Sequence, residues 1–222
     1  MEREDLVSAA QRLLARDARD PLRVDDVLGE AGLSTRAFYR HFHSRTELFL
    51  ALLAAEAGRA AERLNGRLAQ APTPEDKVRA WVEGVLALAY DSRLAARARL
   101  FAGERASLAQ EFPTEVDRCV RTQLAPLEDV IAAGRDEGAF PGADPVADAR
   151  AVHHICAGLM ADKLWGSGAM RRERAVALAT GFALQALRAN GTERRPAREA
   201  GPLARPAREA GPFARPAREG HK

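Results

Sequence analysis

Apolar residues recur at intervals of three and four along most of this chain, and no stretch alternates apolar and polar positions with a period of two. Such intervals place side chains on one face of an α-helix. The first such face, within residues 2–18, is formed by Leu6, Ala10, Leu13 and Leu14. Pro21 then ends this helix, because proline disfavours helical backbone at the residue before it, Asp20. The pattern predicts an all-α protein.

Beyond residue 46 the same spacing predicts six more helices. They cover residues 47–70, 74–90, 92–103, 113–137, 145–164 and 171–188. The second of these has the clearest start, since Thr73, Pro74 and Asp76 suit the N-cap, the first turn and the capping box. Its inward face is predicted to consist of Val78, Trp81, Val82, Val85 and Leu86. In the fourth, Pro126 should kink or divide the helix, because proline lacks the backbone N–H that a helix interior uses.

Two short helices are predicted to meet at a tight turn near residue 32. Gly32 can adopt the left-handed conformation that ends one helix, and the hydroxyl of Ser34 can accept a backbone N–H at the start of the next. The packing face of the first helix is formed by Val24, Val27, Leu28 and Ala31. Ser44 and Glu47 form a capping box that opens the long helix downstream.

The second of these short helices has two unlike faces. Its apolar side is formed by Leu33, Ala37, Phe38 and Phe42. Its other side carries Thr35, Arg36, Tyr39 and Arg40. Hydroxyls, guanidinium groups and a phenol suit phosphates and base edges, so this arrangement resembles the recognition helix of a helix-turn-helix. The alternative is a helical hairpin whose polar face is simply solvated.

Several motifs at fixed spacing favour the first interpretation. They are Gly32-Leu33-Ser34, Phe38-Tyr39, His41-Phe42, Ser44-Arg45 and Glu47-Leu48. In these residues the chain resembles the TetR/AcrR family of bacterial transcriptional regulators. The resemblance covers roughly the first fifty residues. It implies a three-helix DNA-binding head followed by a helical ligand-binding and dimerisation bundle.

The resemblance also implies a set of DNA-binding residues. They are Ser34, Thr35, Arg36, Ala37, Tyr39, Arg40, His41 and Arg45. Within this set Thr35, Arg36 and Ala37 would approach bases. Tyr39 and His41 would contact phosphates, and Arg40 would contact either a base or a phosphate. Arg45 would contact a phosphate from the start of the following helix.

Two residues depart from the family pattern at the first helix of the motif. Arg23 stands where the family usually has a capping threonine, and its side chain offers no oxygen to a backbone N–H. Asp25 stands where a polar or basic residue often helps to hold DNA. Because Asp25 and Asp26 suit the positive end of the helix dipole, the helix should still form without contributing phosphate contacts.

These observations predict three parts: a head over residues 1–47, a body over 48–191 and a tail over 192–222. The apolar side of the last helix is predicted to hold Val176, Ala179, Phe182, Ala183, Ala186 and Leu187. By the resemblance, the last two helices pack against those of a second copy. The alternative, which spacing alone leaves open, is a bundle within one chain. A two-fold dimer would place its recognition helices about 34–36 Å apart, one turn of DNA.

The tail repeats with a period of ten residues from Arg195 onward. It is predicted to be disordered, because each repeat contains helix-breaking prolines. Residues 192–222 carry eight basic residues and four glutamates, so the tail holds +4 of a chain whose net charge is +3. The tail either adds phosphate contacts that raise nonspecific DNA affinity or is a neutral expansion without a role.

Composition fits a globular protein, since 46% of the 222 residues are hydrophobic. The longest apolar run, residues 48–55, is far shorter than the roughly 20 residues that cross a bilayer. The first residues lack the pattern of an export signal, so a cytoplasmic location is expected. Cys119 and Cys156 are too few for a disulfide framework and are expected to be reduced and buried.

His153, His154 and Cys156 raise the question of a metal site or a catalytic group. Adjacent histidines point about 100° apart on a helix, so only His153 and Cys156 share a face, and two ligands are too few. No nucleophile elbow or phosphate-binding glycine loop occurs. We therefore predict no enzyme activity, no metal and no cofactor.

The predicted body has more of the character of a ligand sensor. Its bulky or adaptable residues are Trp81, Tyr90, Phe101, Phe112, Cys119, His153, Met160 and Trp165. All of these except Tyr90 are candidate ligand contacts, with ordinary core packing as the alternative. The prediction is a homodimeric repressor that a small, apolar ligand releases from a palindromic operator. The alternatives are a DNA-binding protein without an inducer and a helical enzyme using His153 or His154.

Overall fold

The computed structural model describes residues 1–16, 22–166 and 170–193, and within these residues all regular secondary structure is α-helical. The helices are α1 (Glu2–Arg16), α2 (Val24–Ala31), α3 (Thr35–His41), α4 (Arg45–Leu68), α5 (Pro74–Tyr90), α6 (Ser92–Glu111), α7 (Pro113–Asp136), α8 (Pro145–Trp165) and α9 (Arg172–Glu193). The all-α prediction is confirmed. Of the predicted tail, residues 192–222, the first two belong to the end of α9, and the rest lies outside the described residues, as does Pro21.

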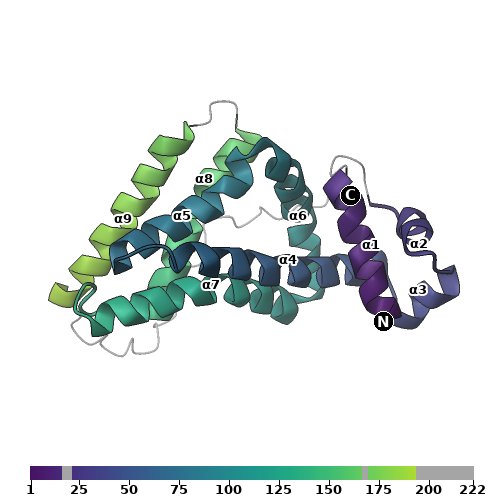
Figure 1. The fold of residues 1–222 in the computed structure, drawn as a ribbon, viewed down its shortest axis with the longest axis horizontal. Helices are drawn as coiled ribbons and strands as arrows, with labels where there is room; N and C mark the ends of the chain where they lie inside the picture. The colour runs from purple at the N-terminus through teal and green to yellow at the C-terminus, as the bar shows by residue number, and fades with distance from the viewer. Residues whose placement is uncertain (17–21, 167–169, 194–222) are drawn as a thin grey trace, which may run out of the picture.

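The molecule is elongated, with a small head at one end and a larger body at the other (Figure 1). Helices α1, α2 and α3 form the head. The long helix α4 starts in the head and runs into the body, where α5, α7, α8 and α9 are grouped. Helix α6 also approaches the head, on the side of α1.

The predicted caps explain where several helices begin. The Thr73 hydroxyl accepts the N–H of Asp76 at 3.1 Å, which confirms Thr73 as the N-cap of α5, and it donates to the Asp76 carboxylate at 2.7 Å. At the start of α4, the Ser44 hydroxyl accepts the N–H of Glu47 at 3.1 Å. The Glu47 carboxylate accepts the N–H of His43 at 2.7 Å rather than that of Ser44. Local hydrogen bonding therefore fixes both starts.

Two large hydrophobic cores and one small cluster of Ala89, Ala95 and Leu164 are present in the described residues. The body core includes the entire predicted inward face of α5, and Trp81 at its centre has no exposed surface. The head core is built around Phe38, Phe42 and Phe49, each at most 2% exposed. The head core also contains Leu108 of α6 and Val116 of α7. Two body helices therefore share the core of the head.

Helix α6 differs from its prediction in length. The sequence pattern predicts an end near Gly103, whereas the helix continues to Glu111. The extension places Leu108 in the head core with no exposed surface. Burying a leucine offsets the cost of one glycine in a helix, about 1 kcal/mol relative to alanine.

Helix α7 runs without a break through Pro126, so of the two predicted outcomes, a kink or a division, the division is wrong. Pro126 is buried, and its neighbours Leu124 and Leu127 are at most 1% exposed in the body core. This apolar packing on both sides keeps the helix together despite the missing hydrogen-bond donor.

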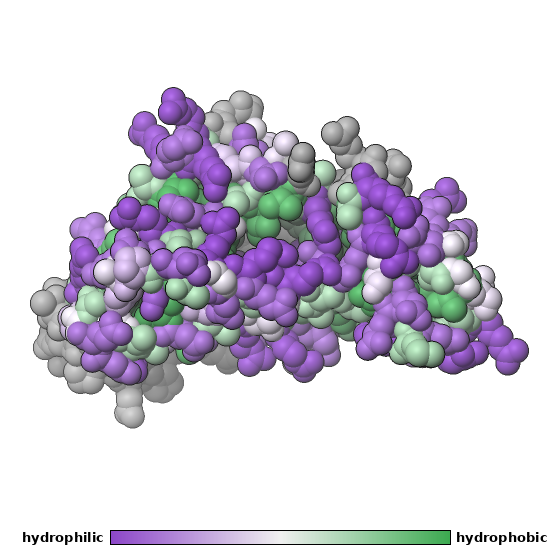
Figure 2. All heavy atoms as spheres, viewed as in Figure 1, coloured by the Kyte–Doolittle hydropathy of each residue, from purple (hydrophilic) through white to green (hydrophobic). Residues whose placement is uncertain are grey.

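The surface is largely hydrophilic on the face seen in Figure 2, where hydrophobic residues reach the surface in separate small areas. In the described part of the chain, every helix is too short or too polar to cross a membrane.

Candidate nucleic-acid interface

The turn between α2 and α3 has the geometry that the sequence predicts. Gly32 is in the left-handed region, with φ of 65°, and the N–H of Leu33 reaches the carbonyl oxygen of Leu28 at 3.1 Å. The Ser34 hydroxyl then accepts the N–H of Ala37 at 3.3 Å and starts α3. Arg23 makes no side-chain cap for α2, as expected. Two helices joined by a short left-handed turn form a helix-turn-helix.

Burial fixes which side of α3 faces outward. Phe38 and Phe42 are 1% and 2% exposed, and their ring centroids lie 5.6 Å apart in the head core. Tyr39 is 61% exposed, with its ring packed edge-on against Phe38 at 5.4 Å. The Tyr39 ring is thereby packed against the head core while most of the residue is exposed. The exposed residues of α3 beside it are Thr35, Arg36 and Arg40.

Ala37 differs from the other predicted DNA-binding residues. Its side chain is only 5% exposed and belongs to the buried side of α3. Because its methyl group packs inward, it does not extend the outward face that would meet bases. The Ser34 hydroxyl is likewise occupied as the N-cap of α3.

The last turn of α3 is joined to the first turn of α1 by a carboxylate. Glu2 Oε2 accepts a hydrogen bond from Arg40 Nη1 at 2.8 Å and lies 3.0 Å from His41 Nε2. The hydrogen bond with His41 and the charge of Arg40 lower the pKa of Glu2 below its usual value. Glu2 is therefore ionised at neutral pH, and Arg40 and His41 both have an acidic neighbour.

Arg45, the remaining predicted DNA contact, is held by both head and body. Its Nε donates to the carbonyl oxygen of Leu22 at 3.1 Å, and its Nη2 donates to Glu104 of α6 at 3.0 Å. Its guanidinium also stacks on Phe49, 4.4 Å from the ring centroid. Glu2 and Glu104 are functional candidates that sequence reasoning missed, because they lie 38 and 59 residues away from Arg40 and Arg45.

The candidate ligand contacts in the body do not form one group. Trp81 and His153 lie together, with ring centroids 6.4 Å apart, and Cys156 lies in the same core. Burial, together with the nearby charge of Arg105 and other cations, lowers the pKa of His153 to about 4, so its ring is neutral at pH 7. Burial also raises the pKa of the Cys156 thiol to about 12. The His153 ring and the Cys156 thiol are therefore both uncharged at neutral pH.

The other candidates lie elsewhere. Phe101 and Phe112 pack against the head core, and Trp165 is 58% exposed at the end of α8. Met160 packs against the body core, and Cys119 of α7 is 6% exposed. Among the described residues, no three histidine, cysteine, aspartate or glutamate side chains are grouped so that they could hold a metal ion.

An open groove of about 640 Å³ runs between α5 and α9, away from these candidates. It is lined by Arg79, Glu83, Arg172, Glu173, Val176, Ala177, Thr180, Gly181 and Leu184. Thr180 is 5% exposed, and its hydroxyl has no hydrogen-bond partner among the described residues. Sequence reasoning did not single out this groove, because its lining comes from two helices almost a hundred residues apart.

A helix-turn-helix that exposes a polar, cationic recognition helix at the end of a helical body defines the class of DNA-binding transcriptional regulators. Residues 6–52 match the family described as bacterial regulatory proteins, tetR family. The matched residues include the whole helix-turn-helix, from α2 to the end of α3. No curated protein matches the sequence.

Solved structures share the fold over 82–84% of this chain. A putative transcriptional regulator from Rhodococcus sp. RHA1 has a TM-score of 0.67 at 20% identity, covering 83% of this chain and 96% of its own. The regulator FadR from Bacillus subtilis, in complex with stearoyl-CoA, has a TM-score of 0.59 at 16% identity and coverages of 84% and 98%. AibR, in complex with isovaleryl coenzyme A and operator DNA, has a TM-score of 0.51 at 16% identity and coverages of 82% and 97%.

Proposed function

We propose that this protein is a homodimeric repressor that binds a palindromic operator and leaves it when a small, largely apolar ligand binds the body. The observation that carries this proposal is the geometry of α3. Its buried phenylalanines fix the helix on the head core, while Thr35, Arg36 and Tyr39 face outward. The protein would act in the cytoplasm and without catalysis.

The proposed contacts follow from the exposed side chains. Thr35 and Arg36, in the first turn of α3, are placed to meet base edges, since the first residues of a recognition helix enter the major groove. Tyr39 would donate its hydroxyl to a phosphate. Phosphates would also be bound by Arg40, His41 and Arg45. In each case the phosphate would have to displace a carboxylate, that of Glu2 or of Glu104.

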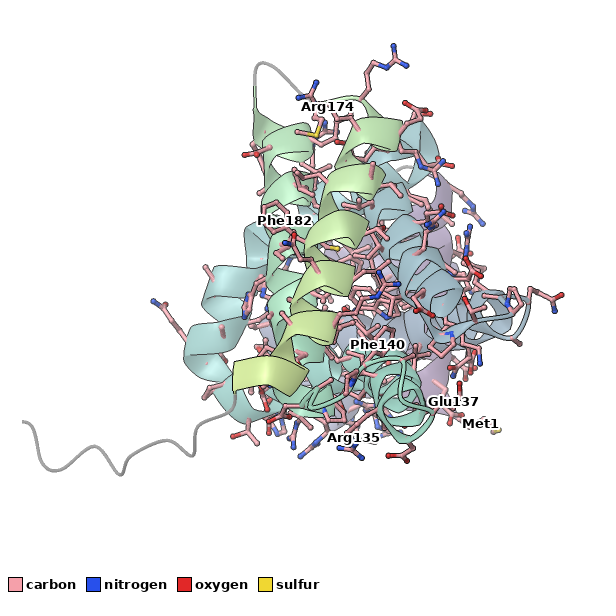
Figure 3. The ribbon with its side chains drawn as sticks, turned by 90° about the vertical axis from the view of Figure 1, so that its left-hand side faces the viewer. Met1, Arg135, Glu137, Phe140, Arg174 and Phe182 are labelled. Atoms are coloured by element: carbon pink, nitrogen blue, oxygen red, sulfur yellow. The ribbon has the colours of Figure 1, made fainter. Side chains whose placement is uncertain are left out.

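The outer faces of α8 and α9 support dimerisation. Phe182 and Trp165 are each 58% exposed, Val146 is 56% exposed and Leu178 is 39% exposed. Figure 3 looks onto this end of the molecule and shows Phe182 beside α9 on the side turned to the viewer. The sequence pattern places Phe182 on the apolar side of α9, yet the chain itself does not bury it. A second copy packed here would cover these apolar side chains.

The neutral, largely buried side chains of Trp81, His153 and Cys156 support an apolar ligand. Trp81 Nε1 is buried and has no hydrogen-bond partner among the described residues, so it could donate to a ligand carbonyl. Because FadR and AibR were crystallised with acyl-CoA thioesters, these are the first ligands to test here. The groove beside Thr180 is the second place to look for binding.

Helix α6 connects the body directly to the head through side-chain contacts. Leu108 packs in the head core, and Glu104 holds Arg45 at the start of α4. Nearer the body, Arg97 of α6 bonds to Glu56 of α4, which also pairs with Arg59. A ligand that displaced α6 would therefore act on the head both through α4 and through Arg45. A coupling of about 1–3 kcal/mol would change DNA affinity roughly 5- to 150-fold.

The experiment that tests the function is fluorescence anisotropy with the DNA upstream of the protein's own gene, at several salt concentrations and against scrambled competitor. Saturable, sequence-preferring binding of one dimer per site is the expected result. Adding stearoyl-CoA and isovaleryl-CoA should then weaken binding if thioesters are inducers. Equal binding to both DNAs would contradict a specific operator there, and binding insensitive to a broad panel of apolar ligands would favour a regulator without an inducer.

A further inference from the structure

We propose that Glu2 is an intramolecular competitor of DNA phosphate, which occupies Arg40 and His41 of the recognition helix and thereby restrains nonspecific DNA binding. This inference rests on the proposed DNA binding and adds a regulating residue outside the helix-turn-helix. It concerns a contact between the first turn of α1 and the last turn of α3.

The contact has the geometry of a carboxylate standing where a phosphate would bind. One oxygen, Oε2, lies 2.8 Å from Arg40 Nη1 and 3.0 Å from His41 Nε2. An anionic oxygen shared by an arginine and a histidine is also what a DNA phosphate would supply. The two anions therefore compete for the same donors.

The exposure of the Glu2–Arg40 ion pair allows a DNA phosphate to replace the Glu2 carboxylate. The Arg40 side chain is 57% exposed and that of Glu2 is 38% exposed, so neither is locked in a core. An exposed pair of this kind is weak enough for a polyanion to replace. The pair also cancels the charge of Arg40 in the free protein, which reduces the attraction of the head for any DNA.

A second glutamate in the first turn of α1, Glu4, provides a matched control for the charge of Glu2. Glu4 lies two residues further on, with an 84% exposed side chain, and pairs with the amino terminus at 3.3 Å. Changing Glu2→Gln or Glu4→Gln removes the same charge from the same turn. Only the first change frees Arg40 and His41.

The experiment compares wild type, E2Q and E4Q by fluorescence anisotropy on a scrambled duplex and on the upstream DNA, over a series of salt concentrations. E2Q should bind the scrambled duplex several-fold more tightly than E4Q. Each head should gain about one phosphate contact, so the slope of log K against log salt should steepen by about 0.9 per head, or about two per dimer. Thermal unfolding of each variant checks that the head stays folded.

A second comparison tests the specific contact. In an R40Q background, the E2Q change should lose most of its advantage over the E4Q change, because the freed arginine is absent and only His41 remains. If E2Q retains its full advantage without Arg40, Glu2 acts through the general field and the inference is wrong.

The outcomes separate this inference from the function. Equal slopes for E2Q and E4Q, with wild type still preferring the upstream DNA, would overturn only the competitor role. Weaker binding by E2Q would overturn it too and would make Glu2 a positioning residue. A steeper slope for E2Q without sequence preference at any genomic fragment would retain the competitor and refute the specific repressor. Failure of all variants to bind any DNA would refute both.

Discussion

Truncating Leu108 tests whether α6 truly belongs to the head as well as to the body. The Leu108→Ala variant removes three carbon atoms from a side chain with no exposed surface. At about 0.8 kcal/mol per carbon this costs about 2.4 kcal/mol, and the cavity left in the head core adds up to about 2 kcal/mol. The helix itself is not weakened, since alanine has the higher helix propensity. The expected loss in the free energy of unfolding is therefore about 2.5–4.5 kcal/mol.

Leu94 provides the matched control, because it is on the same helix and 38% exposed. Leu94→Ala makes the same chemical change and should cost less than about 1 kcal/mol. Urea unfolding followed by circular dichroism measures both, at one protein concentration because a dimer's stability depends on it. Equal losses for the two variants would refute the placement of Leu108 in the head core. If the head unfolds separately, the loss should fall in the head transition.

Three further predictions concern DNA binding and assembly. Tyr39→Phe keeps the ring that packs on Phe38 and removes the hydroxyl, so operator binding should weaken at unchanged stability; equal affinity in a filter-binding assay would remove Tyr39 from the phosphate contacts. Arg36→Ala should cost about 1–3 kcal/mol and relax base preference at one position of each half-site; an unchanged profile of selected sites would mean that Arg36 contacts only the backbone. Phe182→Glu puts a charge on the proposed dimer face and should yield monomers in sedimentation experiments, whereas an intact dimer would place the interface elsewhere.

The sequence by itself determined the local features of the head. The end of α2 requires a residue that tolerates a left-handed backbone, and Gly32 supplies it. The start of α3 requires a capping oxygen, and Ser34 supplies it two residues later. The apolar spacing that buries Phe38 also decides that Tyr39 is exposed, because successive helical residues point in different directions. The N-caps at Ser44 and Thr73 were predictable as well, because each hydroxyl bonds to a backbone N–H only three residues further along the chain.

Helix lengths in the body were less predictable, because packing between distant segments competes with local propensity. Gly103 is a local signal to stop, yet α6 continues because Leu108 finds a core that belongs to the head. Pro126 is a stronger signal, yet α7 continues because leucines on both sides of it are buried. Neither partner surface can be deduced from the window of residues around the signal.

Only the tertiary structure decided which charges meet and which apolar residues remain uncovered. Glu2 and Arg40, or Glu104 and Arg45, come together through the angles at which whole helices pack. The periodicity of α9 marks Phe182 as apolar but does not say what covers it, and in the folded chain it remains 58% exposed. Hydrophobic spacing and capping act over one or two turns, whereas these contacts depend on segments that many residues separate. That difference in range is the physical reason why the sequence alone determines the recognition helix. The contacts that Glu2 and Glu104 make with Arg40 of this helix and with Arg45 are determined only by the tertiary structure.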